Sequence, residues 1–185
     1  MDDRPLPRWI WASILVGAGF FIVALLVSAI FDPTIRVLHI LQALIYIAVI
    51  VLARRNSAWG FGAGFTISLV WNYVNLFVTT FIAAGLHQLS VLLHTGRIER
   101  PDLLIAVVAG GGHFLLLAGC LAGFLRLRPG GRQWARFVAG GVVAVLYFAA
   151  IIVTTGPQYV HLFKRVFHIA GLVGAGVPEN LETRT

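Results

Sequence analysis

Charged residues and cysteine are both scarce in this chain, and each scarcity argues against a class of protein. Only 11% of the 185 residues are charged, against roughly 25% in soluble domains, while 59% are hydrophobic. The single cysteine, Cys120, leaves no partner for a disulfide within the sequence. No CxxC, CxxCH or HExxH spacing occurs, so no motif indicates structural zinc or c-type haem. The composition is not that of a soluble, disulfide-linked or motif-defined metal protein.

Long stretches without a charged residue dominate the chain instead. They cover residues 9–31, 37–53, 56–96, 103–125 and 137–163. A helix needs roughly 20 mostly apolar residues to cross a hydrocarbon core of about 30 Å. The stretches are continuous rather than alternating, which indicates helices and not a β-barrel. We therefore predict an all-α, polytopic transmembrane helical bundle that forms one integral membrane domain over residues 1–177.

The helix bounds follow from the positions of charges and helix breakers. The third stretch is too long for one span, so we divide it into a span and an interfacial, mildly amphipathic segment at residues 85–94. Gly156 and Pro157 end the last span. The five predicted spans are residues 9–31, 35–53, 59–83, 103–125 and 135–155.

The C-terminal stretch predicts a different kind of helix. Over residues 157–176, His161, Lys164, Arg165 and His168 gather on one face and apolar residues on the other. A basic, amphipathic helix lies on a membrane surface more often than it crosses. We expect a surface helix there, with a partial sixth span as the alternative, and a disordered tail at residues 178–185.

The basic residues stand at span ends, where they set orientation. Arg54, Arg55 and the four arginines of residues 126–136 mark one side as cytoplasmic, and this side includes the N-terminus. The C-terminus is then outside if there are five spans. The net charge of +7 is thereby explained without a nucleic-acid partner. We expect the first span to be retained rather than cleaved, and the preference for arginine over lysine favours a bacterial inner (plasma) membrane.

Polar residues recur on one face of several spans. In the third span Ser68, Asn72, Asn75 and Thr79 fall at offsets of 0, 4, 7 and 11, which share a helix face. Polar side chains in lipid usually turn toward the bundle interior or a wet cavity. The first span has no such stripe and is expected to be outermost. The residues predicted to bind a ligand, along a polar seam that opens outward from the midplane, are Asn72, Asn75, His113, Tyr46, Tyr147 and Gln42.

A structural interpretation of the same residues stays open. Ser, Thr and Asn join helices in lipid, and small residues let helices touch, as the spacing of Gly60 with Gly64 and of Gly119 with Gly123 would allow. His113 has three possible roles: a hydrogen-bonded structural residue, a proton-linked group, or a ligand of metal or haem.

The seam favours a small membrane protein that binds or translocates a small polar solute. The alternative is a non-catalytic accessory or assembly subunit, packed against a larger membrane partner or copies of itself. A subunit with b-type haem or metal is less favoured, since His39, His87 and His94 are only weak metal candidates and no cofactor is predicted. The spans contain neither a nucleophile beside a base nor a pair of carboxylates, and this argues against an enzyme.

Overall fold

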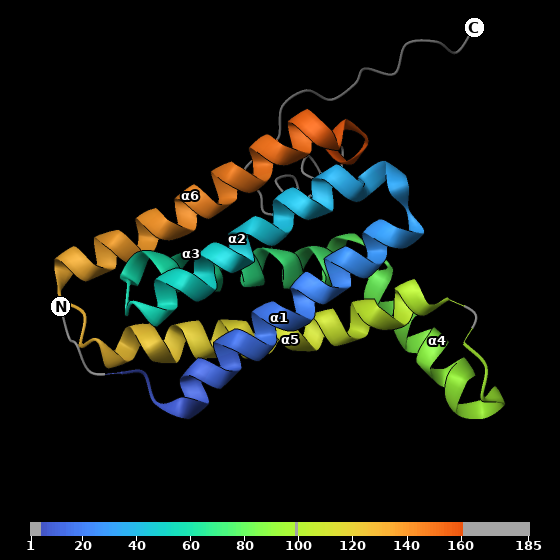
Figure 1. Cartoon of the computed structure of the whole chain (residues 1–185), viewed down its shortest axis with the longest axis horizontal. Helices are drawn as coiled ribbons and strands as arrows, with labels where there is room; N and C mark the ends of the chain where they lie inside the picture. The colour runs from blue at the N-terminus through green and yellow to red at the C-terminus, as the bar shows by residue number, and fades with distance from the viewer. Residues whose placement is uncertain (1–4, 99, 161–185) are drawn as a thin grey trace, which may run out of the picture.

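The computed structural model describes residues 5–98 and 100–160 as a bundle of helices without a strand (Figure 1). Five helices in this part of the chain are long and apolar enough to cross a membrane, counting the short turns that extend two of them. The predicted all-α transmembrane bundle is confirmed. The long helices are α1 (Arg8–Phe31), α2 (Arg36–Arg54), α3 (Ala58–Tyr73), α5 (Pro101–Arg126) and α6 (Gly131–Thr155).

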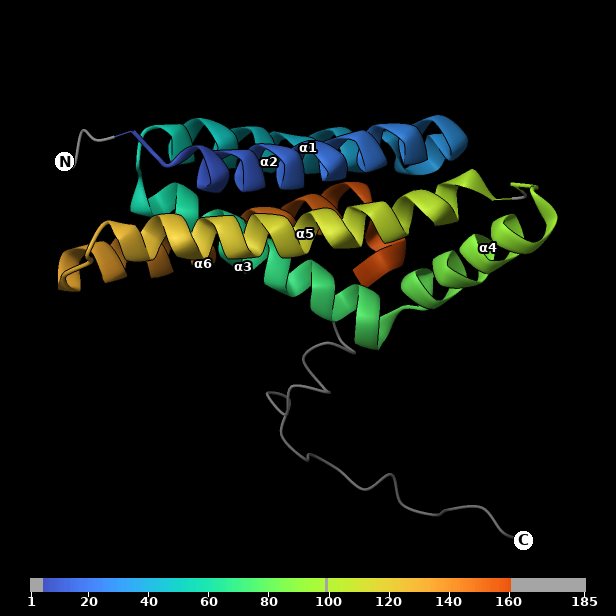
Figure 2. The same cartoon turned by 90° about the horizontal axis from the view of Figure 1, so that it is seen from below.

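The long helices pack around a common core. Helix α1 lies along α2 and α5, while α3 lies along α5 and α6 and also contacts α2 (Figures 1 and 2). Although α1 was expected to be outermost, its Ile14 and Ala18 are completely buried. A helix without a polar stripe can still present a core face, because the apolar residues of a span serve lipid and protein contacts equally well.

The third predicted span, residues 59–83, is broken in the structure. Helix α3 ends at Tyr73, a π-helical turn follows at Val74–Val78, and Thr79 is extended with φ −112° and ψ 168°. Helix α4 (Phe81–Thr95) then begins, and it contains the segment predicted to lie at the interface. The Thr79 hydroxyl and the Asn72 Nδ2 have no hydrogen-bond partner among the described residues, so neither group bonds the backbone at the break.

Helix α4 leaves the bundle and packs mainly on the beginning of α5 (Figure 2). Gly85 permits this contact, because a Cβ there would stand 2.6 Å from the carbonyl oxygen of Leu103. Gly96, with φ +68°, ends α4 in the left-handed conformation that glycine adopts without strain.

Short turns follow the C-terminal ends of α1 and α6. After α1, the Asp32 carboxylate accepts hydrogen bonds from the Thr34 backbone N–H at 3.0 Å and its hydroxyl at 2.6 Å. These bonds lower the pKa of Asp32. After α6, a 3₁₀ turn covers Pro157–Tyr159. The predicted surface helix lies largely, and the predicted disordered tail entirely, outside the described residues.

Candidate functional site

Two of the predicted seam residues meet in the packed core. Tyr46 Oη lies 2.9 Å from His113 Nε2, and both side chains are completely buried. The Phe21 ring covers the pair, with centroid distances of 3.9 Å to His113 and 4.7 Å to Tyr46. His113 Nδ1 has no hydrogen-bond partner in the described part of the chain. This pair joins α2 to α5 and does not line the cavity described below.

Two further predicted residues stand apart from that pair. The Tyr147 hydroxyl donates to the Leu41 carbonyl at 2.7 Å and so links α6 to α2. Asn72 is buried in α3, and its Nδ2 has no partner within residues 5–98 and 100–160. Neither residue lines the cavity. The bond of Tyr147 agrees with the packing role that polar residues often have between helices in lipid, whereas Asn72 is buried without such a bond from its Nδ2.

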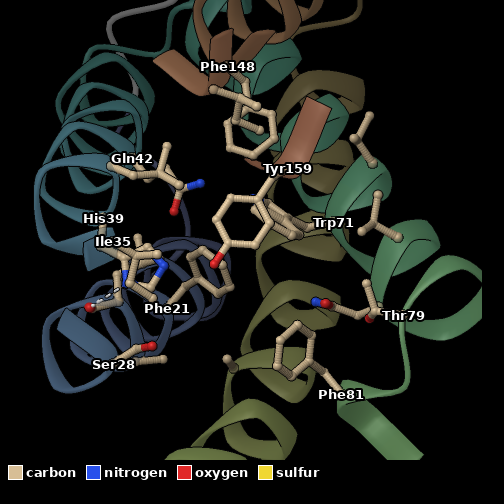
Figure 3. Close-up of a pocket in the computed structure, with 18 of the residues that line it drawn as sticks. Phe21, Ser28, Ile35, His39, Gln42, Trp71, Thr79, Phe81, Phe148 and Tyr159 are labelled. Atoms are coloured by element: carbon tan, nitrogen blue, oxygen red, sulfur yellow. Dashed lines mark hydrogen bonds between the residues drawn. The ribbon is translucent and has the colours of Figure 1, made fainter. Parts of the chain in front are cut away.

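A cavity of about 210 Å³ lies at the end of the bundle where the α1–α2 turn, the π-helical turn and the end of α6 meet. Gln42 and Asn75, both predicted to bind a ligand, line it. Figure 3 shows Gln42 and His39 on one side, Trp71 and Thr79 on the other, and Tyr159 between them. Five aromatic rings contribute to its wall: Phe21, Trp71, Phe81, Phe148 and Tyr159.

Three residues of the cavity wall each carry a buried hydrogen-bonding atom without a partner. Gln42 is only 2% exposed, and its Oε1 is unpaired among the described residues, as are Trp71 Nε1 and Thr79 Oγ1. Leaving a buried polar group unpaired costs about 1–3 kcal/mol. Asn72, Gln88 and His113 carry such atoms too and do not line the cavity, so these atoms are not by themselves a mark of a binding site.

His39 adds a polar atom to the same wall. Its Nδ1 lies 3.2 Å from the Leu25 carbonyl, which can only accept a hydrogen bond. Nδ1 must therefore carry the hydrogen, and Nε2 of the neutral ring is an acceptor. Among the residues of the described part of the chain that line the cavity there is no Asp, Glu, Lys or Arg. These residues offer hydrogen-bonding groups and apolar surface.

The three weak metal candidates are not brought together. His39 lies in α2, whereas His87 and His94 lie on α4, where His94 Nδ1 is 2.8 Å from the Ser90 carbonyl. Within the described ranges no three His, Cys, Asp or Glu residues are close enough to hold a metal ion.

Sequence reasoning missed Trp71. Trp9, Trp11, Trp59 and Trp134 occupy the ends of their helices, as an interfacial aromatic belt requires. Trp71 instead stands within the third span, away from its ends, and lines the cavity. A tryptophan at such depth is a signal of a polar partner inside the bundle.

Comparison of the chain with models of protein families, with curated proteins and with solved structures finds no match. The cavity and the residues that line it are therefore the features from which a function can be proposed.

Proposed function

We propose that this chain binds a small uncharged solute in the cavity between α1, α2, α3 and α6. The observation that carries the proposal is the cavity of about 210 Å³, whose wall combines five aromatic rings with the polar residues His39, Gln42 and Asn75. These polar residues would offer hydrogen bonds to a bound solute. The aromatic wall would hold its apolar part.

The distribution of arginines supports an opening toward the outer side of the membrane. Arg54, Arg55, Arg126, Arg128 and Arg132 stand at the opposite end of the bundle from the cavity. By the positive-inside rule that end is cytoplasmic. We accordingly propose a bacterial inner membrane with the N-terminus in the cytoplasm.

The packing below the cavity supports binding over free passage. Ile14, Phe61, Leu116 and Phe124 are completely buried toward the proposed cytoplasmic end. Phe21 closes the cavity floor over the Tyr46–His113 pair. Translocation would require these helices to separate, whereas binding requires no rearrangement.

A cavity-filling substitution tests the proposal. Ala24 is 7% exposed and lines the cavity from α1, so Ala24→Phe should occupy the solute's space. Ala12 is exposed on the same helix, and Ala12→Phe is the matched control. We expect mass spectrometry to detect a small molecule extracted from wild-type protein and from the control in lipid nanodiscs, but not from Ala24→Phe. Equal recovery from both variants would refute binding at this cavity.

An accessory role is the second candidate, and helix α4 is the observation that favours it. Helix α4 packs mainly on α5 and leaves the apolar side chains of Leu86 and Leu93 exposed. A larger membrane protein or a second copy could cover that face. Recovery of a stoichiometric partner from mild detergent, lost when Leu86 and Leu93 are changed to Ala, would support this role.

A further inference from the structure

The end of the bundle away from the cavity concentrates positive charge that the proposed function does not use. Arginines stand there at the start of α1 and around the α2–α3 and α5–α6 connections (Figures 1 and 2). Four of them lie within residues 126–136 and form the arginine cluster: Arg126, Arg128, Arg132 and Arg136. We propose that the arginine cluster binds the phosphate headgroup of an anionic phospholipid. This site goes beyond the solute proposed for the cavity and is independent of it.

Side-chain contacts fix the arginine cluster against the helices around it. The Phe124 ring of α5 meets the Trp134 ring of α6 edge to face, with a centroid distance of 4.7 Å. Arg126 Nη1 donates to the Pro5 carbonyl at 2.8 Å, which ties the end of α5 to the segment before α1. The α5–α6 connection is thus held on both sides, and its arginines have a defined place on the bundle.

The backbone brings like charges together within the cluster. Arg132 and Arg136 are four residues apart on α6, a spacing that places them on one face, where like charges repel. Arg128 has φ +48°, a left-handed conformation that glycine adopts without strain and arginine does not. The fold alone would be served better by other residues at these positions. A bound anion would offset the repulsion.

The acidic residues of the chain cannot neutralise this end. Asp32 and Asp102, the acids within residues 5–98 and 100–160, stand at the opposite end, after α1 and in the first turn of α5. Residues 1–4, 99 and 161–185 together carry four basic and five acidic side chains, a net charge of only −1. Wherever those residues lie, most of the cluster's charge is left for an external anion.

The surroundings of the cluster favour a lipid over a soluble phosphate. Trp134 is exposed beside the arginines, as tryptophans at a membrane–water interface are. Leu125 and Val138 are exposed next to Arg126 and Arg136, where acyl chains would cover them. The planar guanidinium matches a phosphate through two parallel hydrogen bonds, and basic sites between helices on the cytoplasmic side bind such headgroups. A phospholipid uses both the charge and the apolar border, whereas a free phosphate uses only the charge.

Native mass spectrometry of the full chain in mild detergent tests the proposal, with lipids of identical acyl chains. Phosphatidylglycerol is the anionic probe, and phosphatidylcholine, whose own ammonium group balances its phosphate, is the reference. We expect phosphatidylglycerol to bind at least about tenfold more tightly, since each arginine near an anionic headgroup favours it severalfold. Glycerol 3-phosphate in about tenfold excess should not displace the bound lipid, because it lacks the acyl chains.

Paired substitutions of equal charge locate the site. Arg128→Gln combined with Arg132→Gln should weaken phosphatidylglycerol binding by about tenfold. Arg54→Gln combined with Arg55→Gln is the matched control, because it removes the same charge from exposed arginines at the same end but outside the cluster, and should weaken binding less than about twofold.

Arg128→Gly separates lipid binding from folding. This substitution removes one charge and relieves the left-handed strain, so the variant should bind phosphatidylglycerol more weakly than wild type yet unfold at no lower temperature.

Each remaining outcome overturns the proposal. Equal affinity for the two lipids, or no retained lipid, means that the cluster does not recognise an anionic headgroup. Equal weakening by the two paired substitutions means that binding follows overall charge and not this site. Displacement by glycerol 3-phosphate means that a soluble phosphate is the occupant. Ala24→Phe should leave phosphatidylglycerol binding unchanged, so failure here and failure of the proposed function are told apart.

Discussion

At the scale of single residues, polar side chains in this bundle take two distinct roles. Tyr46, His113 and Tyr147 sit in core or interhelical contacts, whereas Gln42 lines the cavity. All four were predicted as ligand-binding residues. The sequence identifies which residues are polar and roughly how deep they lie. It does not reveal whether another protein atom satisfies them, because that depends on contacts between distant helices such as α2 and α5.

Removing the Tyr46 hydroxyl should destabilise the fold. Tyr46→Phe leaves the His113 Nε2 buried without its 2.9 Å partner, at a cost of about 1–3 kcal/mol. Tyr147→Phe is the matched control and should cost about 0.5–1.5 kcal/mol, since the Leu41 carbonyl it frees has a second lone pair. Unfolding by denaturant in detergent micelles measures both values. A Tyr46→Phe protein as stable as wild type would mean that the pair contributes nothing to stability.

At the scale of helices, the five apolar spans could be predicted but the break in the third could not. Charge-free runs of sufficient length define spans almost directly. The prediction that Asn72 and Asn75 lie on the same face, however, assumed one continuous helix. The π-helical turn at Val74–Val78 widens the helix by one residue, which changes the face on which later residues lie. Asn72 consequently lies buried away from the cavity, while Asn75 lines it.

Glycines allow some of the helices to approach closely. The structure shows which glycines such contacts need and one glycine, Gly111, that no contact needs. A Cβ at Gly62 would overlap the Phe137 carbonyl of α6, and one at Gly140 would overlap the Trp59 carbonyl of α3. At Gly111, in the middle of the run of three glycines, a Cβ would meet nothing within 4 Å. The spacings of Gly60 with Gly64 and of Gly119 with Gly123 predicted helix contacts, and a Cβ at any of these four would come within 3.0 Å of another helix.

Alanine substitutions at these glycines should therefore act in opposite directions. Gly62→Ala forces α3 and α6 apart and should destabilise the protein by about 1–3 kcal/mol, the usual cost of overpacking. Gly111→Ala should be neutral or stabilising by up to about 1 kcal/mol, because alanine is the better helix former. Thermal unfolding of the two variants in the same detergent compares them. A Gly111→Ala protein less stable than Gly62→Ala would contradict the packing.

At the scale of the whole molecule, the arrangement of charges predicts how the bundle is oriented across the membrane. The arginines near the α2–α3 and α5–α6 connections stand at one end, and the cavity at the other. The positive-inside rule then predicts a cytoplasmic basic end and an outward cavity. Sequence reasoning supplies this orientation, but the existence and volume of a cavity depend on side-chain packing among five helices, which no periodicity encodes.

Cysteine labelling in whole cells tests the orientation. Gly130, in the α5–α6 connection, and Thr95, at the end of α4, are both exposed, so a cysteine can be placed at either position. The native Cys120 is fully buried and should stay unlabelled. A membrane-impermeant maleimide added outside should label Thr95→Cys but reach Gly130→Cys only after the cells are lysed. Labelling of Gly130→Cys in intact cells, with Thr95→Cys protected, would reverse the topology.

The most direct test of the central claim is a titration of 4-fluorophenol, a small uncharged aromatic probe, against wild type and Ala24→Phe in matched nanodiscs. The claim is that the cavity lined by Gln42 and Trp71 binds an uncharged solute. Saturable binding to wild type, abolished by Ala24→Phe, is the predicted result. A linear uptake that is the same for wild type, Ala24→Phe and empty nanodiscs would contradict it.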